Sequence, residues 1–239
     1  MRISGKVVLI TGASEGIGAA CAREFAAAGA RLSLTARKEE GLRRAAPPDA
    51  LIASGDITVD LDRRRVVERT LERFGAIDIL INNAGVGIYQ PSWEMPMEEA
   101  RYLMELNFFA PLAMTQLVAP HMRSRHSGFL VNVGSIGGKV VLPWMTLYSV
   151  TKSALGALTE GQRMELMRAM FNSTMAGKRR IASTKSHPER GVTTVRASRS
   201  TPRRMARAHA SGVMAKRRAC WTFSGDWPAR TFFWKPVLT

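Results

Sequence analysis

The sequence is poor in the features that mark secreted, metal-binding and membrane proteins. Its 239 residues include two cysteines, Cys21 and Cys220, which cannot form a disulfide framework or a four-ligand zinc site, so no metal centre is predicted. The longest apolar stretch, 106–120, contains Asn107 and two prolines, which argues against a transmembrane span. The apolar run near the N-terminus, Val7–Ile10, is too short for a signal peptide. We therefore expect a cytoplasmic protein with reduced thiols.

Acidic residues are scarce at the C-terminal end, and most of the net charge of +16 therefore lies there. Residues 1–168 carry 20 Lys and Arg against 17 Asp and Glu, whereas residues 169–239 carry 15 against 2. The segment 172–218 also has few large apolar side chains, so it cannot offset the entropy of folding. We predict a folded domain over 1–168 and a basic tail over 169–239 that is disordered or aberrant in origin.

Short apolar runs alternate with amphipathic segments across the first part of the chain. The apolar runs suit strands buried on both faces of a parallel sheet, and the longer segments have helical spacing of apolar side chains. Predicted strands cover 6–11, 31–35, 51–54, 77–81 and 128–133, and predicted helices cover 16–28, 38–46, 61–74, 97–106, 108–122 and 147–168. This order predicts an α/β fold with right-handed βαβ crossovers and a doubly wound parallel sheet.

A glycine-rich turn follows the first predicted strand and reads TGASEGIG at 11–18. A cofactor pyrophosphate binds backbone N–H groups at a helix N-terminus, where a Cβ would block its approach. Gly12 permits the turn, Gly16 permits the close approach, and Gly18 permits packing of the helix on the strand. The pattern predicts a dinucleotide site, with a glycine-rich turn that binds nothing as the alternative.

The end of the second predicted strand indicates which dinucleotide binds. An acidic residue here accepts a hydrogen bond from the ribose 2′-hydroxyl of NAD, whereas an arginine suits the 2′-phosphate of NADP. This chain has Arg37, which favours NADP and leaves NAD as the second candidate. Glu15 in the glycine-rich turn opposes a phosphate, and a solvated loop arginine is the alternative interpretation.

Two further strand ends carry polar residues at the carboxyl edge of the sheet, where ligands bind such folds. Asp56-Ile57 follows the third strand, and NNAG at 82–85 follows the fourth. Buried amides can join neighbouring strands, and Gly85 lets the backbone approach a ribose. Capping of the loops by these side chains is the alternative at both strand ends.

A serine, a tyrosine and a lysine form the predicted chemical centre. Ser135 ends the fifth predicted strand, and Tyr148 and Lys152 lie one turn apart on the last predicted helix, so their side chains face the same way. A phenol with a pKa of about 10 is a poor base at neutral pH, and a nearby ammonium stabilises its phenolate. Of the three tyrosines only Tyr148 has a lysine four residues on, although a surface pair has the same spacing.

These residues, in this order, resemble the motifs of the short-chain dehydrogenase/reductase family. The resemblance covers 1–168 and is carried by TGASEGIG at 11–18, DI at 56–57, NNAG at 82–85, Asn107, Ser135 and YSVTK at 148–152. It implies a Rossmann-type fold and NAD(P)-dependent hydride transfer between the cofactor and an alcohol or carbonyl substrate. Tyr148 would transfer the proton, and Lys152 would bind the nicotinamide ribose. Ser135 would hydrogen-bond the substrate oxygen, and Asn107 would hold a water in the proton relay.

The resemblance also defines the expected ligands. The predicted cofactor-binding residues are Gly12, Ser14, Glu15, Gly16, Ile17, Gly18, Arg37, Asp56, Ile57, Asn83, Ala84, Gly85, Tyr148 and Lys152. Segments 86–96 and 143–145 carry aromatic and apolar side chains that favour a hydrophobic substrate. Apolar helix faces within 108–122 and 147–168 indicate a second copy of the chain as a partner, with burial inside one copy as the alternative.

The sequence departs from the family after the last predicted helix. Members continue into a sixth strand and a Pro-Gly loop that ends in Thr, whereas this chain contains no Pro-Gly dipeptide. We therefore expect a sheet that is incomplete at its C-terminal side, with the fifth strand as an unpaired edge. One alternative function is a pseudo-enzyme that binds cofactor without turnover. A less favoured one is nucleic-acid binding by the basic tail and its interleaved aromatics.

Overall fold

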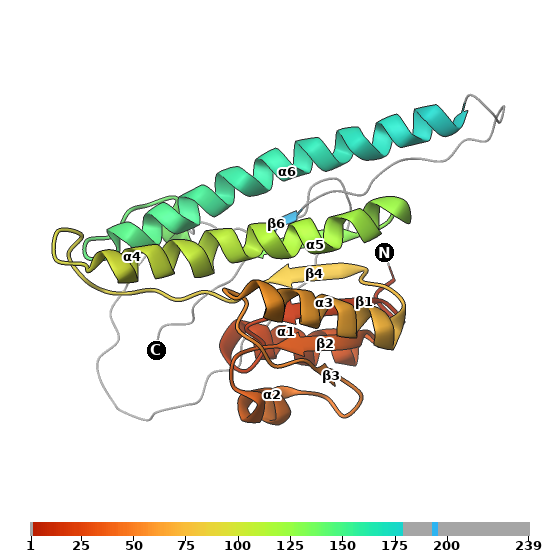
Figure 1. Cartoon of the computed structure of the whole chain (residues 1–239), viewed down its shortest axis with the longest axis horizontal. Coiled ribbons are helices and arrows are strands. Elements are labelled where there is room, and N and C mark those ends of the chain that lie inside the picture. The colour runs from red at the N-terminus through yellow and green to blue at the C-terminus, as the bar shows by residue number, and fades with distance from the viewer. Residues whose placement is uncertain (1, 179–192, 196–239) are drawn as a thin grey trace, which may run out of the picture.

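The computed structural model describes residues 2–178 and 193–195, and this part of the chain forms one parallel sheet flanked by helices (Figure 1). The strands are β1 (Val7–Thr11), β2 (Arg31–Thr35), β3 (Leu51–Ile52), β4 (Ile79–Asn82), β5 (Phe129–Val133) and β6 (Thr193–Val195). They pair in the order β3-β2-β1-β4-β5-β6, and each pairing is parallel. The chain order reverses between β1 and β4, which confirms the predicted doubly wound, Rossmann-type sheet.

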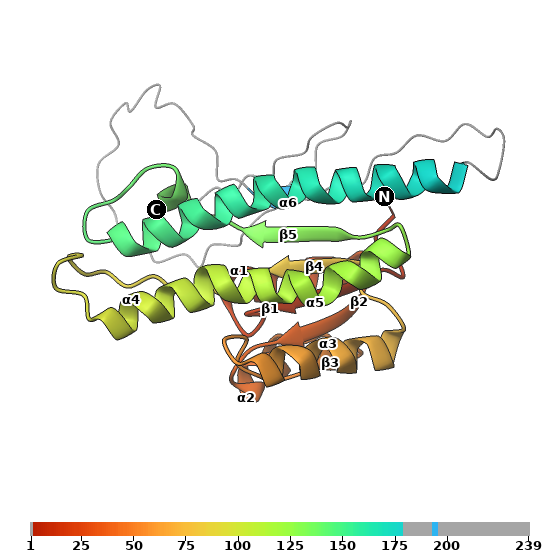
Figure 2. The same cartoon turned by 45° about the horizontal axis from the view of Figure 1, so that its top comes forward.

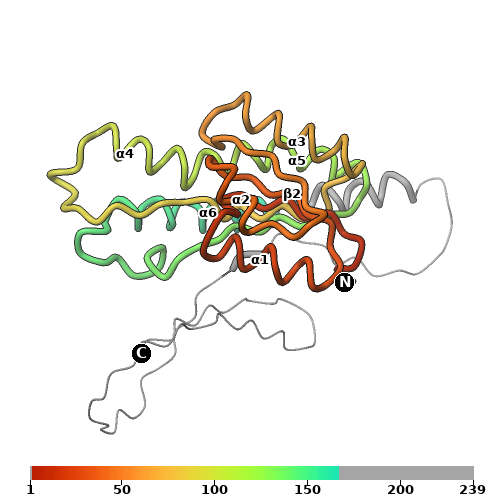
Figure 3. The backbone as a smooth tube through the Cα atoms, turned by 90° about the horizontal axis from the view of Figure 1, so that it is seen from below, coloured from red at the N-terminus to blue at the C-terminus, as the bar shows by residue number. Residues whose placement is uncertain are grey.

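Helices cover both faces of this sheet (Figures 2 and 3). They are α1 (Gly16–Ala27), α2 (Glu39–Ala45), α3 (Asp60–Phe74), α4 (Met97–Met104), α5 (Ala110–Ser124) and α6 (Thr146–Lys178). One face packs on α1 and α2 through a cluster that includes Ala22 and Leu42. The other face packs on α3 and α5 through a cluster that includes Val67 and Val118. The strands are therefore buried between two apolar layers, as their continuous apolar runs predict.

Most of the predicted elements are confirmed to within a few residues, and two differ, one in length and one in kind. β3 has two residues where four were expected. A π-helical segment, η1 (Glu105–Phe109), joins α4 to α5 where the sequence predicted two α-helices. A π-turn adds one residue to a helical turn and is frequent at functional sites. Apolar spacing does not reveal it, because the residues on either side keep their helical pattern.

The expectations for the C-terminal end need two corrections. The last helix continues to Lys178 instead of ending at residue 168, since the alanines and methionines that follow still favour helix. β5 is not an unpaired edge, because the β-branched triplet Thr193–Val195 pairs with Val131–Val133. The rest of the predicted tail, 179–192 and 196–239, lies outside the described residues, together with most of its basic side chains.

A buried carboxylate at the amino-terminal edge of the sheet holds three chain segments together. Asp78, directly before β4, accepts hydrogen bonds from the Val7 amide and Arg125 Nη2, both at 2.9 Å. Lys6 Nζ lies 3.5 Å from the same carboxylate. Burial alone would raise the pKa of Asp78, but the Val7 amide and the two cations together hold it below its ordinary value. The carboxylate therefore stabilises the fold as an anion.

We expect Asp78→Ala to lower the free energy of unfolding by about 3 kcal/mol at neutral pH, since Val7 and Arg125 lose a buried anionic partner. This stabilisation is present above the ordinary carboxyl pKa of about 3.9 and is lost as the pH falls through the lower folded-state value. Urea unfolding at pH 7 and pH 3 should show a smaller gap between wild type and variant at the lower pH.

The control for this experiment is Glu72→Ala, which removes an exposed acid from α3. Its effect on the free energy of unfolding should stay below about 0.5 kcal/mol at both pH values, because exposed side chains contribute little to stability. An Asp78→Ala gap that is the same at pH 7 and pH 3 would contradict the role given to the ionised carboxylate.

Candidate active site

A cleft of about 810 Å³ lies at the carboxyl ends of β1, β2, β4 and β5, where the strand order reverses. Its walls come from the turns after these strands and from α1, α2 and α6. The predicted site residues that line it are Gly12, Ser14, Glu15, Ile17, Arg37, Asp56, Ile57, Asn83, Ala84, Gly85, Tyr148 and Lys152. Gly16, Gly18, Asn107 and Ser135 were also predicted but are not among the lining residues.

The turns after β1 and β4 pack so closely that only glycine fits at their contact. Gly12 has a positive φ of 64°, and a Cβ there would lie 2.8 Å from the Ala84 Cα. A Cβ on Gly18 would lie 2.2 Å from the Gly12 carbonyl oxygen and 2.6 Å from Asn83 Nδ2. These distances account for glycine at both positions, and they bring α1 close to the end of β4.

The side chain of Asn83 ties the same two turns together. Its Nδ2 donates to the carbonyl oxygens of Thr11 at 2.9 Å and of Gly12 at 3.0 Å. The backbone amides of Asn83 and Ala84 donate to Thr11 Oγ1 at 3.0 and 3.1 Å. Asn83 therefore shapes the turn that lines the cleft.

The N-terminus of α1 lies in the cleft wall, between the lining residues Glu15 and Ile17. Glu15 makes no capping hydrogen bond with its side chain, and beyond the adjoining backbone no described residue comes within 4 Å of the point where a Cβ of Gly16 would stand. The first N–H groups of a helix have no partner within the helix, and the helix dipole favours an anion beside them. The residues present therefore fit the pyrophosphate of a dinucleotide.

Basic side chains gather where β2 ends. Arg37, Lys38 and Arg44 line the cleft, and Arg37 Nη1 donates to the Tyr102 hydroxyl at 3.2 Å. Sequence analysis identified Arg37 but missed the other two cations. Arg44 lies on α2, and its neighbour Gly41 packs on the glycine-rich turn, so only the folded arrangement brings this helix to the cleft.

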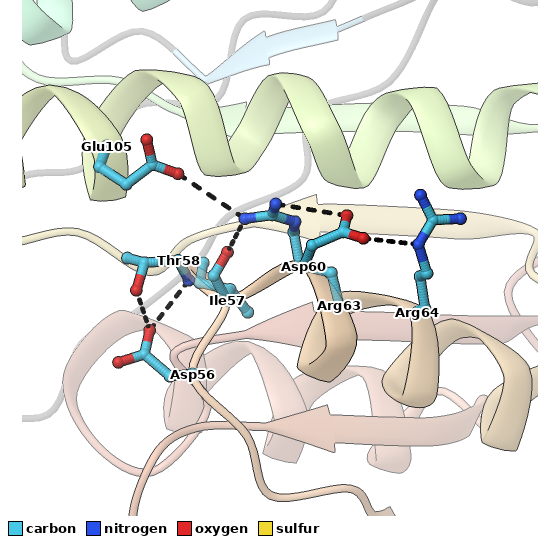
Figure 4. A network of polar contacts seen from close by, with 7 residues as sticks. All are labelled: Asp56, Ile57, Thr58, Asp60, Arg63, Arg64 and Glu105. Carbon is cyan, nitrogen blue, oxygen red and sulfur yellow. Dashed lines mark hydrogen bonds and ion pairs between the residues drawn. The ribbon is translucent and has the colours of Figure 1, made fainter.

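The turn after β3 is held by polar contacts within the turn and by Arg63 of α3. Asp56 Oδ1 accepts hydrogen bonds from the amide and the hydroxyl of Thr58 at 2.9 and 2.7 Å. Arg63 Nη1 donates to the carbonyl oxygen of Ile57 at 2.8 Å (Figure 4). Loop capping and cleft lining, which the sequence left as alternatives, occur together at Asp56.

Lys152 is a buried cation beside an aromatic ring. Lys152 is only 7% exposed, and its Nζ donates to the Val133 carbonyl oxygen at 3.0 Å. The same Nζ lies 6.0 Å from the centroid of the Tyr148 ring. Burial lowers the pKa of Lys152 from 10.5 to about 8. The amine is therefore still mainly an ammonium at neutral pH.

The Tyr148 ring lies between two glycine backbones. A Cβ on Gly87 would lie 3.5 Å from Tyr148 Cδ2, and a Cβ on Gly137 would lie 3.2 Å from Tyr148 Cε1. Gly137 belongs to the 3-10 turn η2 (Ile136–Gly138), and its amide donates to Ser135 Oγ at 3.1 Å. The same Cβ would lie 3.5 Å from Ser135 Oγ, so the serine hydroxyl and the tyrosine ring approach one side of this turn.

Asn107 is fully buried in η1, and its amide group is used within the protein. Its Oδ1 accepts from the Val86 amide at 2.9 Å, and its Nδ2 donates to the Val86 carbonyl oxygen at 2.8 Å and to Thr151 Oγ1 at 3.1 Å. Asn107 thus clamps the turn after β4 onto α6. A Cβ on Gly85 would lie 2.9 Å from Asn107 Oδ1 and 3.3 Å from Lys152 Nζ, so glycine is also required there.

The sequence therefore identified part of the cleft lining and did not show how these side chains are held. The clamp through Asn107 has no signal in the sequence beyond the asparagine itself. Within residues 2–178 and 193–195, no helix is long and apolar enough to cross a membrane. The same residues hold no group of three His, Cys, Asp or Glu side chains that could bind a metal ion.

Known proteins resemble this chain over most of its described residues. The model of the short chain dehydrogenase family matches residues 6–177. The 11-beta-hydroxysteroid dehydrogenase-like 4A of Arabidopsis thaliana is 33% identical over 204 residues, which cover 81% of this chain and 60% of that protein. Dehydrogenase/reductase SDR family member 7B of Danio rerio is 37% identical over 177 residues, covering 69% and 57%. The chain thus spans less than two thirds of the length of these relatives.

Solved structures share its fold. A short-chain dehydrogenase from Streptomyces avermitilis is 39% identical with a TM-score of 0.66, over 71% of this chain and 63% of that one. A metagenomic short-chain oxidoreductase in complex with NADP is 33% identical with a TM-score of 0.67, over 71% and 80%. An enzyme from Burkholderia phymatum in complex with NAD is 26% identical with a TM-score of 0.71, over 82% and 66%.

We expect Gly18→Ala to weaken NADPH binding by at least about tenfold, because the added methyl group would displace the Gly12 carbonyl and the Asn83 amide. Fluorescence titration with NADPH measures the change. Gly156→Ala on α6 is the matched control, since no atom lies within 4 Å of its Cβ position. Equal affinities for Gly18→Ala and the control would show that the packing of the two turns does not shape the binding site.

Proposed function

The chain belongs to the short chain dehydrogenase family, and we propose that it is an NAD(P)-dependent oxidoreductase that interconverts an alcohol and a carbonyl compound. The observation that carries the proposal is a buried ammonium, Lys152, beside Tyr148 in a cleft lined by the glycine-rich turn. A charged amine is costly to bury, so its retention next to a phenol supports a chemical role.

When bound, the nicotinamide cofactor supplies the hydride transfer to or from the substrate carbon. Tyr148 gives its hydroxyl proton to the substrate oxygen on reduction and takes it back on oxidation. Ser135 donates a hydrogen bond to the same oxygen and stabilises the charge that develops there. The Lys152 ammonium stabilises the phenolate that Tyr148 becomes after giving up its proton.

We propose that NADP is the preferred cofactor. Three cations line the cleft near the end of β2, namely Arg37, Lys38 and Arg44. A cluster of cations is suited to bind the 2′-phosphate of NADP. The acidic Glu15, Glu40 and Asp56 also line the cleft and reduce this preference, so it depends on the guanidinium groups lying nearer to the 2′-phosphate than these carboxylates do. Structural neighbours bind either NADP or NAD, so the preference rests on these side chains.

We propose a hydrophobic alcohol or ketone as the substrate. Val86 and Met145 line the cleft, and the adjoining aromatic rings of Tyr89 and Trp144 lie 5.8 Å apart. The Gln90 amide donates to the Trp144 carbonyl oxygen at 2.7 Å, so the two loops form one apolar rim. The relative named hydroxysteroid dehydrogenase-like is compatible with an apolar alcohol of this kind.

The alternatives rest on other parts of the chain. A pseudo-enzyme that binds cofactor without turnover remains the alternative, because the sequence after α6 contains no Pro-Gly loop of the kind expected of the family. The exposed apolar side chains of Phe109, Val150 and Met164 support a second copy of the chain as partner. Nucleic-acid binding by the basic tail depends on residues that lie mostly outside the described ranges.

We expect Tyr148→Phe to lower kcat with NADPH and a hydrophobic ketone by at least about 100-fold, because the variant has no hydroxyl proton to transfer. NADPH affinity should stay within about twofold of wild type, since the ring itself is kept and its packing between Gly87 and Gly137 is preserved. Steady-state kinetics and NADPH fluorescence measure the two quantities. Near-normal turnover would rule out Tyr148 as the proton donor, and binding without turnover in the wild type would favour the pseudo-enzyme.

We expect Arg37→Ser to weaken NADPH binding by about tenfold and NADH binding by less than about twofold, because only NADPH carries the 2′-phosphate. Parallel titrations with both cofactors measure the ratio. The matched control is Arg43→Ser on α2, an exposed arginine that pairs with Glu39 and does not line the cleft. A loss of equal size for both cofactors would contradict the assignment of NADP.

A further inference from the structure

A buried arginine lies outside the proposed chemistry. Arg63, on α3, is 9% exposed, and its Nε is buried with no hydrogen-bond partner in the part of the chain that the structure describes. The neighbouring Arg64 is exposed and pairs with the same acid, Asp60. A buried guanidinium has lost much of its hydration, so it is retained only where its contacts compensate. Besides Asp60, Arg63 contacts two further residues, Ile57 and Glu105, for which Arg64 shows no contact.

One of these two contacts leads to the cleft, and the other leads to the π-helix. Arg63 Nη1 donates to the Ile57 carbonyl oxygen at 2.8 Å, and Ile57 lines the cleft. The same Nη1 lies 3.7 Å from Glu105 Oε1, and Nη2 lies 3.4 Å from Asp60 Oδ1. Figure 4 shows Arg63 between the turn that carries Ile57 and the ribbon that carries Glu105. The planar fork directs Nη1 to Ile57 and Glu105 and Nη2 to Asp60 at the same time, whereas a lysine offers one point charge.

Glu105 is the first residue of η1, and this π-helix holds the clamp on α6. Two residues later, Asn107 binds both backbone groups of Val86 and the hydroxyl of Thr151. Thr151 in turn donates to the carbonyl oxygen of Tyr148 at 2.7 Å. The turn at Ile57 is thus connected to the helix of Tyr148 through Arg63, η1 and Asn107.

Apolar packing supports the same connection. Ile57, Leu106 and Ala110 form a buried cluster, with Ala84 and Tyr102 packed against it. Leu106 lies inside η1 and also lines the cleft. The polar contact through Arg63 and this apolar cluster therefore hold the same two segments, the turn after β3 and the π-helix.

We propose that Arg63 is a positioning residue that couples the turn at Asp56–Ile57 to the Asn107 clamp and hence to Tyr148. A dinucleotide that contacts Ile57 then binds best when the clamp is closed, so cofactor binding and the placement of Tyr148 favour each other. The predicted effect of Arg63 on cofactor affinity rests on the proposed function. The predicted effect of Arg63 on the Asn107 clamp does not, because it can be measured in the protein without cofactor.

Amide hydrogen exchange of the cofactor-free protein tests the clamp. The probe is the Val86 amide, which donates to Asn107 Oδ1. We expect Arg63→Ala and Glu105→Gln each to lower the protection of this amide by about tenfold, because η1 loses its tie to α3. Arg64→Ala is the matched control and should leave it unchanged. Unchanged protection in Glu105→Gln and Arg63→Ala, or an equal loss in Arg64→Ala, overturns the proposal.

NADPH binding and rescue by guanidinium test the coupling to cofactor. We expect Arg63→Ala to raise the dissociation constant for NADPH about tenfold, and millimolar guanidinium to restore part of the affinity and of the Val86 protection. Guanidinium should have no such effect on Arg64→Ala. If Arg63→Ala does not fold, Glu105→Gln and Arg63→Lys carry the exchange test, the lysine variant being expected to lose protection as well.

The two proposals fail in different ways. If the wild type binds no NADPH, the proposed function is wrong, and the Val86 exchange still decides whether Arg63 holds the clamp. If the wild type binds NADPH but Arg63→Ala binds it equally well with a weakened clamp, the coupling is overturned and the function stands. If binding and protection fall together and guanidinium restores both, the proposal is confirmed.

Discussion

The contact between the turns after β1 and β4 sets the geometry of the cleft. These strands are neighbours in the sheet, and the connections that follow them leave toward opposite sides, so a crevice is bound to open between them. Asn83 and Thr11 hydrogen-bond the two turns to each other, and Gly12 and Gly18 leave no gap at the contact. The N-terminus of α1 is thereby held against the end of β4, where an anion and a reacting group could bind side by side.

The position of α6 depends on a second, buried set of polar contacts. Asn82 Nδ2 on β4 donates to Asn132 Oδ1 on β5, and Asn132 Nδ2 donates to Thr159 Oγ1 on α6, both at 2.9 Å. Thr159 Oγ1 donates to the Leu155 carbonyl oxygen at 2.6 Å. Such directional contacts fix the register of a helix along a sheet in a way that apolar packing alone does not. Lys152 lies two turns earlier on the same helix, so these hydrogen bonds also fix the position of Lys152 in the cleft.

What could be predicted from the sequence is what depends on neighbouring residues in the chain. Strand runs, helical faces and the glycine-rich turn are local patterns, and the Tyr148–Lys152 spacing places both side chains on one helix face without further information. The resemblance to a known family rests on the motifs that follow successive strands, taken in their order along the chain. These signals account for the fold as far as α6 and for about half of the residues that line the cleft.

The features that were missed depend on contacts between distant segments. The π-helix begins at Glu105, which lies 3.7 Å from Arg63 on another helix, and Arg44 lies on α2, which Gly41 lets approach the glycine-rich turn. The pairing of Thr193–Val195 with β5 joins residues far apart in a segment whose composition suggested no strand. No periodicity within one segment records such contacts, since the partner lies elsewhere in the chain.

Lys152 carries a buried charge whose cost depends on the acceptors around it. Its burial lowers the pKa to about 8, so the ammonium destabilises the fold below that pH, and stability rises between about 8 and the ordinary value of 10.5 as the folded chain releases a proton that the unfolded chain keeps. One carbonyl oxygen, that of Val133, offsets this cost only in part. Every further acceptor near Nζ favours the ammonium, whether it is a phenolate at Tyr148 or a hydroxyl of a bound ligand. A ligand that offers such an acceptor would therefore bind with proton uptake at Lys152 and would relieve part of the cost of the buried charge.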